Sequence, residues 1–174
     1  RAMQNNTQIR GIHQGLVLYG ATNNDWYPGQ DRKGAFVTNA VHGDGVSTEN
    51  NFQVLLDRAF FTSEYAISPL ESKTEFVALG TVDTTNYSYA TQSVSVEFSN
   101  AANEWRATTS VDAIIVSDRA INNDSGGENV ANIKSVHTNP DDATGDWKGG
   151  VCFNDNHTEM VQTEIAENTQ YDKG

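Results

Sequence analysis

A hairpin near the C-terminal end of the chain constrains the fold more than any other sequence feature. The stretch Asp146–Val161, DWKGGVCFNDNHTEMV, predicts two short strands, Gly150–Phe153 and Thr158–Thr163, on either side of a polar turn. Asp155 and Asn156 suit the centre of this turn, because Asp and Asn tolerate the positive φ angles that tight hairpin turns impose. The pattern therefore predicts a small antiparallel sheet that closes the domain.

The opposite end of the chain has the spacing of an α-helix. From Asn5 to Ala21 the apolar residues recur at intervals of three and four positions, which places them on one helical face. Gly11 and Gly15 lie on a neighbouring stripe and weaken an isolated helix by about 1 kcal/mol each, so another element should pack closely against them. The residues expected to hold the helix to the sheet are Ile9, Ile12, Leu16 and Tyr19.

Shorter elements and long loops are expected between these two ends. A second helix is predicted at Thr48–Phe61, a short extended piece at Tyr65–Pro69 and a turn at Asn100–Asn103. The expected strands are Tyr87–Ala90, Ser93–Phe98, Ile114–Val116 and a hairpin partner at Trp105–Ser110. We therefore expect a single α+β domain in which an N-terminal helix packs on an antiparallel sheet with long loops.

The charge of the chain excludes one class of partner. With 11 Lys and Arg against 23 Asp and Glu, the formal net charge is -12 at pH 7, and the basic residues are scattered. Nucleic acid requires clustered basic side chains that neutralise its phosphates, so nucleic-acid binding is not expected. The mean hydropathy of -0.56 is typical of a soluble, loop-rich domain. The sequence contains no run of about 18 apolar residues, so it predicts no membrane span.

Motifs for catalysis and for zinc are missing from the sequence. There is no phosphate-binding loop, dinucleotide-binding glycine pattern or serine-nucleophile motif, so we expect no enzymatic activity. Cys152 is the one cysteine, and its place in a predicted strand favours a buried, inert thiol. Together, His137, Cys152, Asp155 and His157 lack the spacing of a zinc site. We expect His157 to form hydrogen bonds within its turn and His137 to lie in a polar loop.

Calcium is the metal for which the sequence offers candidate ligands. Oxygen atoms of Asp and Asn in loops suit a hard cation, although no EF-hand spacing is present. The alternative is that these side chains are solvated turn residues. One candidate cluster comprises Asp118, Asn122, Asn123, Asp124 and Glu128, and the other comprises Asp141, Asp142 and Asp146.

Several short motifs follow one another in the order found in a known family. They are Ile9-Arg10-x-Ile12 with Leu16 and Tyr19, the Asn-Asn-Asp-Trp-Tyr-Pro run ending at Pro28, Phe60-Phe61-x-x-x-Tyr65-x-Ile67-x-Pro69, Ser117-Asp118-Arg119, Ser135-Val136-His137, and Gly149-Gly150-Val151 followed by Asp155-x-His157. This order resembles type IV pilin-like proteins, which include the pseudopilins of type II secretion. In the resemblance, Pro28 marks the helix exit, and Asp155 and His157 mark the terminal turn.

The resemblance implies a single pilin-like globular domain over residues 1–174. Residues 1–22 would be the C-terminal half of the pilin helix, 23–80 a connecting region with a second helix, and 81–174 an antiparallel sheet and loops. The protein would be a non-enzymatic structural subunit of a type IV pilus-like filament or a type II secretion pseudopilus, and its partners would be copies of itself and related subunits.

The same resemblance implies a location in the bacterial cell envelope, periplasmic or at the cell surface. A hydrophobic helix ahead of Arg1 would anchor the subunit in the inner membrane before assembly, so the chain would be a soluble truncation. Some secretion pseudopilins use calcium to order a C-terminal loop, which adds support to the calcium candidates.

A secreted carbohydrate-binding β-rich module, with or without calcium, is the alternative from a different class. Its sugar-stacking surface would use Trp26, Tyr27, Trp105 and Trp147. The favoured alternative is that these aromatic side chains pack over loops and sheet edges. A conventional cleaved signal peptide before Arg1 would favour the carbohydrate-binding module over the pilin-like subunit.

Overall fold

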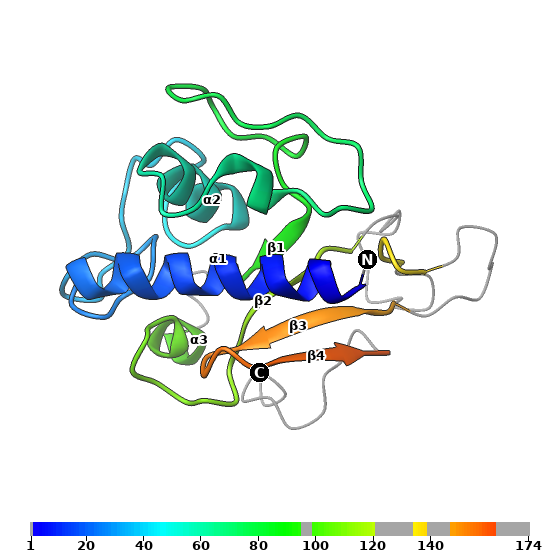
Figure 1. The fold of residues 1–174 in the computed structure, drawn as a ribbon. Coiled ribbons are helices and arrows are strands. Elements are labelled where there is room, and N and C mark those ends of the chain that lie inside the picture. The colour runs from blue at the N-terminus through cyan, green and yellow to red at the C-terminus, as the bar shows by residue number, and fades with distance from the viewer. Residues whose placement is uncertain (1, 95–98, 121–133, 139–146, 163–174) are drawn as a thin grey trace.

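The chain folds around one long helix that lies across a small sheet (Figure 1). The computed structural model describes residues 2–94, 99–120, 134–138 and 147–162. Helix α1 spans Ala2–Thr22 and packs on the sheet through contacts with its two central strands. The four strands are antiparallel in the order β1-β2-β3-β4. The α+β fold predicted from the sequence, with an N-terminal helix on an antiparallel sheet, is confirmed.

The sheet ends in the predicted hairpin. Gly149 pairs with Val161 and Cys152 pairs with Thr158, so the two final strands run in register to the turn. Within the turn Asn156 has a φ of 70°, the conformation that Asn tolerates better than most residues. The strands are β1 (Tyr89–Thr91), β2 (Ile114–Asp118), β3 (Gly149–Phe153) and β4 (Thr158–Val161).

The apolar stripe of α1 supplies the centre of the core. All four predicted residues are buried: Ile9, Ile12, Leu16 and Tyr19. The two glycines also do what the sequence predicted, because each permits an aromatic ring to approach the helix backbone. A Cβ at Gly11 would lie 2.5 Å from Cε1 of Tyr65, and a Cβ at Gly15 would lie 2.8 Å from Cδ1 of Phe61.

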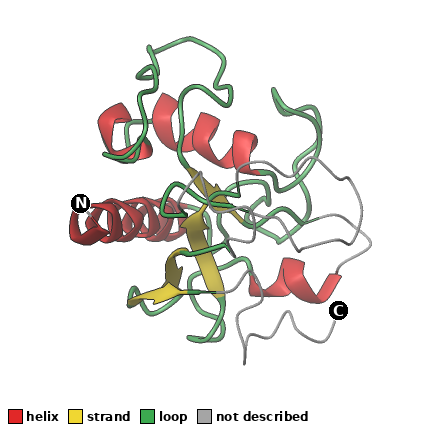
Figure 2. Cartoon of the chain, turned by 90° about the vertical axis from the view of Figure 1, so that its right-hand side faces the viewer, coloured by secondary structure: helices red, strands yellow, loops and turns green. Residues whose placement is uncertain are grey.

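Helix α2, Thr48–Asp57, covers the side of α1 opposite the β3–β4 hairpin (Figures 1 and 2). The Ser47 side chain caps its first turn by accepting a hydrogen bond from the Asn50 backbone N–H. Phe52 is buried and stacks on Tyr87 with ring centroids 4.9 Å apart. The helix ends earlier than predicted, and two residues later Ala59 has a left-handed φ of 52°.

Three of the shorter predicted elements differ in the structure. A 3₁₀ helix, η1, spans Ser63–Ala66 and includes the first two residues of the piece expected to be extended, whereas Ile67 does have extended backbone angles. Helix α3, Ser99–Glu104, replaces the predicted turn at Asn100–Asn103. The predicted strand Trp105–Ser110 is also wrong, since Arg106 forms an isolated bridge with Trp26 and the chain then turns.

The burial of two apolar residues explains why the chain forms α3 instead of the predicted turn. Ala102 and Trp105 are buried three positions apart, so one short helical turn places both against the core.

In the predicted strand Ser93–Phe98, Val94 forms an isolated bridge with Val46, and residues 95–98 lie outside the described part of the chain.

Candidate functional site

A buried polar cluster joins the beginning of α1 to the middle of the sheet. Asp118, the last residue of β2, is 2 % exposed. Asn5 Nδ2 lies 3.0 Å from each of its carboxylate oxygens, and the Gly150 N–H donates to Oδ2 at 2.7 Å. His137 Nε2 lies 3.0 Å from the same Oδ2. The carboxylate therefore connects α1, β2, β3 and a segment that follows β2.

The amide oxygen of Asn5 extends this cluster to two hydroxyl groups. Ser68 Oγ donates to it at 2.8 Å, and the Tyr89 hydroxyl lies 2.9 Å from it and 2.7 Å from Gln8 Oε1. Burial and the nearby Asp118 charge raise the pKa of Tyr89 above its ordinary value, so this hydroxyl stays a proton donor. We call this set the Asp118 cluster: Asn5, Gln8, Ser68, Tyr89, Asp118 and His137.

The sequence did not predict the Asp118 cluster. Its central contact joins Asn5 and Asp118, which are 113 positions apart, and no local pattern marks either residue. His137 was expected in a polar loop, but its side chain is largely buried against Asp118. The signals that could have indicated the cluster were weak: an Asn on the apolar face of a helix and an Asp at the end of an apolar strand.

The calcium candidates are divided between described and undescribed residues. Asp118 is the described member, and its carboxylate already accepts hydrogen bonds from protein donors. Within the ranges that the structure covers, no group of three or more His, Cys, Asp or Glu side chains is arranged to hold a metal ion. Calcium binding stays a prediction, because the other candidates lie outside the described residues: Asn122, Asn123, Asp124, Glu128, Asp141, Asp142 and Asp146.

A second buried polar group lies beneath the hairpin turn. His13 Nδ1 is 3.0 Å from Asn156 Oδ1, and His13 Nε2 is 3.4 Å from both Asn154 Oδ1 and the Tyr27 hydroxyl. The Tyr27 hydroxyl donates to Asn154 Oδ1 at 2.7 Å. Burial lowers the pKa of His13, although the Asn156 and Asn154 hydrogen bonds and the Asp155 charge oppose this shift. Below the same turn, burial raises the pKa of the Cys152 thiol to about 12, which makes it a poor nucleophile.

The lowered pKa of His13 predicts how stability depends on pH. Between the folded-state pKa and the ordinary value of 6.5, the unfolded chain binds a proton at His13 that the folded chain does not. The free energy of unfolding should therefore decrease as the pH falls below about 6.5 and stop decreasing once the pH is below the folded-state pKa. Urea unfolding of the wild type and His13→Gln at pH 7.5 and pH 5 measures this effect. If both proteins lose the same stability on acidification, His13 is not the responsible group.

The hairpin turn is fixed by its own side chains. The His157 ring stacks on Phe153 with centroids 4.3 Å apart, and its backbone N–H donates to Asp155 Oδ1 at 3.0 Å. The His157 ring nitrogen Nδ1 also contacts this oxygen. Hydrogen bonds from His157, first from its backbone, hold the pKa of Asp155 below its ordinary value. The local role predicted for His157 is confirmed.

The aromatic residues proposed for sugar stacking pack inside the fold. Tyr27 and Trp105 are fully buried with ring centroids 5.1 Å apart, and Trp147 is also buried. Trp105 Nε1 donates to the Pro28 carbonyl at 2.7 Å, which fixes the exit from α1. Trp26 is partly buried, and the Arg106 guanidinium lies 4.5 Å from its ring centroid. These rings therefore form no open platform for a sugar.

A surface groove of about 370 Å³ runs along the outward side of α1. The helix contributes Arg10, Gln14 and Leu18, and the opposite wall includes Phe61 and Tyr65. Among the described residues that line the groove, Arg10 is the one charged side chain. We call this feature the α1 groove. It combines apolar walls with a single positive charge.

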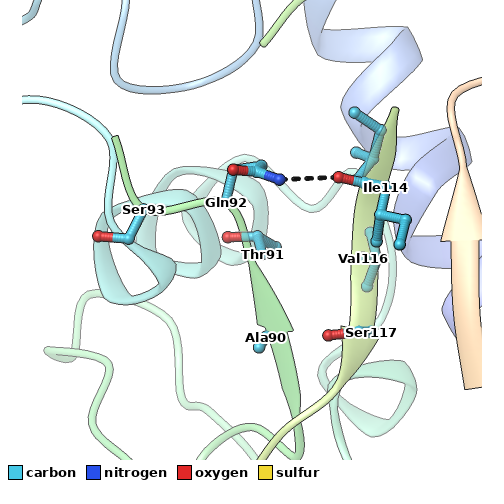
Figure 3. A pocket seen from close by; sticks show the side chains of 8 residues that line it. Ala90, Thr91, Gln92, Ser93, Ile114, Val116 and Ser117 are labelled. Atoms are coloured by element: carbon cyan, nitrogen blue, oxygen red, sulfur yellow. Dashed lines mark hydrogen bonds between the residues drawn. The ribbon is translucent and has the colours of Figure 1, made fainter. Parts of the chain in front are cut away.

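A smaller pocket of about 160 Å³ lies where β1 separates from β2 (Figure 3). Beyond Thr91 the strands no longer pair, and the Gln92 side chain donates to the Ile114 carbonyl at 2.9 Å instead (Figure 3). The lining contains no ionisable side chain. Its geometry follows from the end of strand pairing and provides no group for acid–base chemistry.

Comparisons with protein-family models, curated proteins and solved structures find no match for this chain. The class that the structure itself defines is an α+β domain with a long N-terminal helix on a four-stranded antiparallel sheet. In the described part of the chain, no helix is both long and apolar enough to span a membrane.

Proposed function

We propose that this chain is the globular head of a structural subunit in a type IV pilus-like filament or a type II secretion pseudopilus. The observation that carries the proposal is the position of α1. One face is buried against the sheet, and the Asp118 cluster fixes its first turns, while its outward face is exposed. A helix held in this way can transmit force between the globular head and the helical segment that would precede α1.

The composition of α1 also supports packing against other subunits. The chain has a net charge of -12, yet α1 contains no acidic residue, and Arg10 is its one Lys or Arg. Its outward side exposes Met3, Val17 and Leu18. Copies of an acidic protein repel each other, and an acid-free helix face is where that repulsion is weakest. This face therefore suits contact with copies of the same chain or with related subunits.

The proposed role includes no bond-making chemistry. Cys152 is a buried, protonated thiol, and the buried His13 and His137 side chains contact amide or carboxylate groups. The protein would act in the bacterial cell envelope, anchored in the inner membrane by a preceding hydrophobic helix before assembly. No observation among the described residues favours the carbohydrate-binding alternative, since its proposed aromatic platform is packed in the fold.

The full-length gene product tests this proposal. We expect a short basic leader and then about 20 apolar residues directly before residue 1, enough to cross a bilayer as a helix. Expressed in cells with a pilus or type II secretion assembly system, that product should appear in a filament fraction sheared from the surface. A conventional cleaved signal peptide, or a processed protein that remains monomeric in the periplasm, would overturn the proposal.

A further inference from the structure

An apolar turn projects from the surface on the far side of α2. Leu79 is 99 % exposed and Val77 is 75 % exposed, and the Gly80 N–H closes the turn by donating to the Val77 carbonyl at 3.0 Å. The loop between η1 and β1 that contains this turn extends beyond α2 in both views of the fold (Figures 1 and 2). We call Val77–Gly80 the Leu79 turn.

The Leu79 turn is held in place rather than loosely attached. Phe76 and Val82 on either side of it are buried in the core. The Gln53 side chain of α2 donates to the Gly80 carbonyl at 3.0 Å and accepts from the Val82 N–H at 2.8 Å. These contacts fix the base of the turn on α2 and present Leu79 to solvent.

The backbone of Leu79 is strained, whereas an exposed leucine can ordinarily adopt an unstrained conformation. Its φ is +71°, a region in which a bulky residue other than Gly is a genuine outlier. Single exposed apolar residues are common, but a strained conformation persists only where the surrounding structure imposes it, and such residues cluster at binding sites. The combination of strain, full exposure and a fixed base points to a contact that Leu79 makes with another molecule.

The α1 groove has the complementary character. Its walls include Leu18, Phe61 and Tyr65, and its volume of about 370 Å³ can receive an aliphatic side chain. The Leu79 turn of the same chain cannot fill it, because Gln53 holds that turn on α2. The Leu79 turn of a second molecule is not restrained in this way.

Arg10 in the α1 groove and Asp57 beside the Leu79 turn have opposite charges. Arg10 lines the α1 groove and makes no ion pair with any residue that the structure describes. Beside the Leu79 turn, Gln53 Nε2 donates to Asp57 Oδ2 at 2.9 Å as well as to the Gly80 carbonyl, so a carboxylate lies next to the turn. The Lys73 ammonium is engaged elsewhere, because it donates to the Thr84 carbonyl and lies over the Tyr87 ring. Opposite charges at two surfaces favour their encounter and set their orientation.

We propose that the Leu79 turn of one subunit inserts into the α1 groove of a second copy of this chain. The inference rests on the proposed filament function and identifies a contact between the globular heads of neighbouring subunits. The two surfaces differ, so each copy offers one turn and one groove. Such a heterologous contact can add one subunit after another. It produces an open filament if the rotation between neighbouring subunits does not close into a ring.

Disulfide trapping tests the contact directly. Leu79→Cys combined with Thr62→Cys, a groove residue, should give a ladder of linked multimers when the concentrated chain is oxidised, because every copy carries both halves of the contact. Cys152 is buried and should not contribute. Val111→Cys with Thr62→Cys is the matched control, since Val111 is an aliphatic residue that is 56 % exposed elsewhere. Ladders of equal extent in both proteins, or no ladder with Leu79→Cys, would overturn the contact.

Sedimentation of the chain without new cysteines gives a second measurement. The wild type should self-associate as its concentration rises, and Leu79→Ser should weaken the association at least about tenfold, because a leucine loses its burial. Val111→Ser should associate like the wild type. A wild type that stays monomeric at millimolar concentration, or a Leu79→Ser protein that associates normally, would overturn the contact.

The same cysteine pair in the full-length protein separates the two proposals. Sheared filaments that form without Leu79–Thr62 cross-links would overturn the docking contact and leave the filament function standing. A full-length chain that forms no filament would overturn the function, and a ladder from the isolated chain would then still support the contact.

Discussion

Asp118→Ala should lower the free energy of unfolding by about 3–5 kcal/mol, because it leaves several buried donors without their acceptor. The donors are Asn5 Nδ2 and the Gly150 N–H, and His137 also loses its carboxylate partner. Such a loss is a large part of the stability of a typical domain, which is about 5–15 kcal/mol. Urea unfolding followed by circular dichroism measures the change.

The control for this substitution is Asp112→Ala, because Asp112 is an exposed acidic residue on the turn before β2. It should change the free energy of unfolding by no more than about 0.5 kcal/mol. A double-mutant cycle with Asn5→Ala then isolates the contact between α1 and β2, since residues in one hydrogen-bond network couple by about 0.5–3 kcal/mol. An Asp118→Ala protein as stable as Asp112→Ala would show that the Asp118 cluster does not secure α1 to the sheet.

The parts of the fold that the sequence predicted correctly have local causes. The stripe from Ile9 to Tyr19 needs the period of a helix and nothing more distant. The hairpin needs two short strands and a turn in which Asn156 can adopt a positive φ. Gly11 and Gly15 predicted a close neighbour, but only the fold showed that the neighbours are Tyr65 and Phe61.

The errors have the opposite cause, because they depend on contacts between distant residues. α3 is a single short helix of weak local preference, and the burial of Ala102 and Trp105 stabilises it. The Asp118 cluster needs α1, β1 and β2 to meet before its members become neighbours. A residue such as Asp118 therefore looked like a loop ligand in the sequence, although in the fold it is a buried acceptor.

The contrast between local pattern and distant contacts also applies to the two surfaces of the proposed contact. The acid-free composition of α1 is visible in the sequence, whereas the α1 groove and the Leu79 turn are not. Leu79 lies in a stretch without clear periodicity, and neither its exposure nor its positive φ follows from its neighbours. The proposed contact between copies depends on surface shape, which the local sequence pattern does not specify.

Trp105→Ala should destabilise the exit from α1 by about 3–5 kcal/mol, the usual cost of removing a large buried aromatic side chain. Trp105 is fully buried against Tyr27, and its indole N–H donates to the Pro28 carbonyl. The conservative variant Trp105→Phe keeps a ring in the core but removes that donor, so it should cost about 1–3 kcal/mol. Equilibrium unfolding in urea measures both losses.

Trp26→Ala provides the matched control, because Trp26 lies in the same exit segment but is only partly buried beneath Arg106. Its loss should cost about 1 kcal/mol, near the centre of the range for single substitutions. The expected order is therefore Trp105→Ala, then Trp105→Phe, then Trp26→Ala. If Trp26→Ala were as destabilising as Trp105→Ala, the exit from α1 would depend on its surface cover instead of on the buried contact between Trp105 and Tyr27.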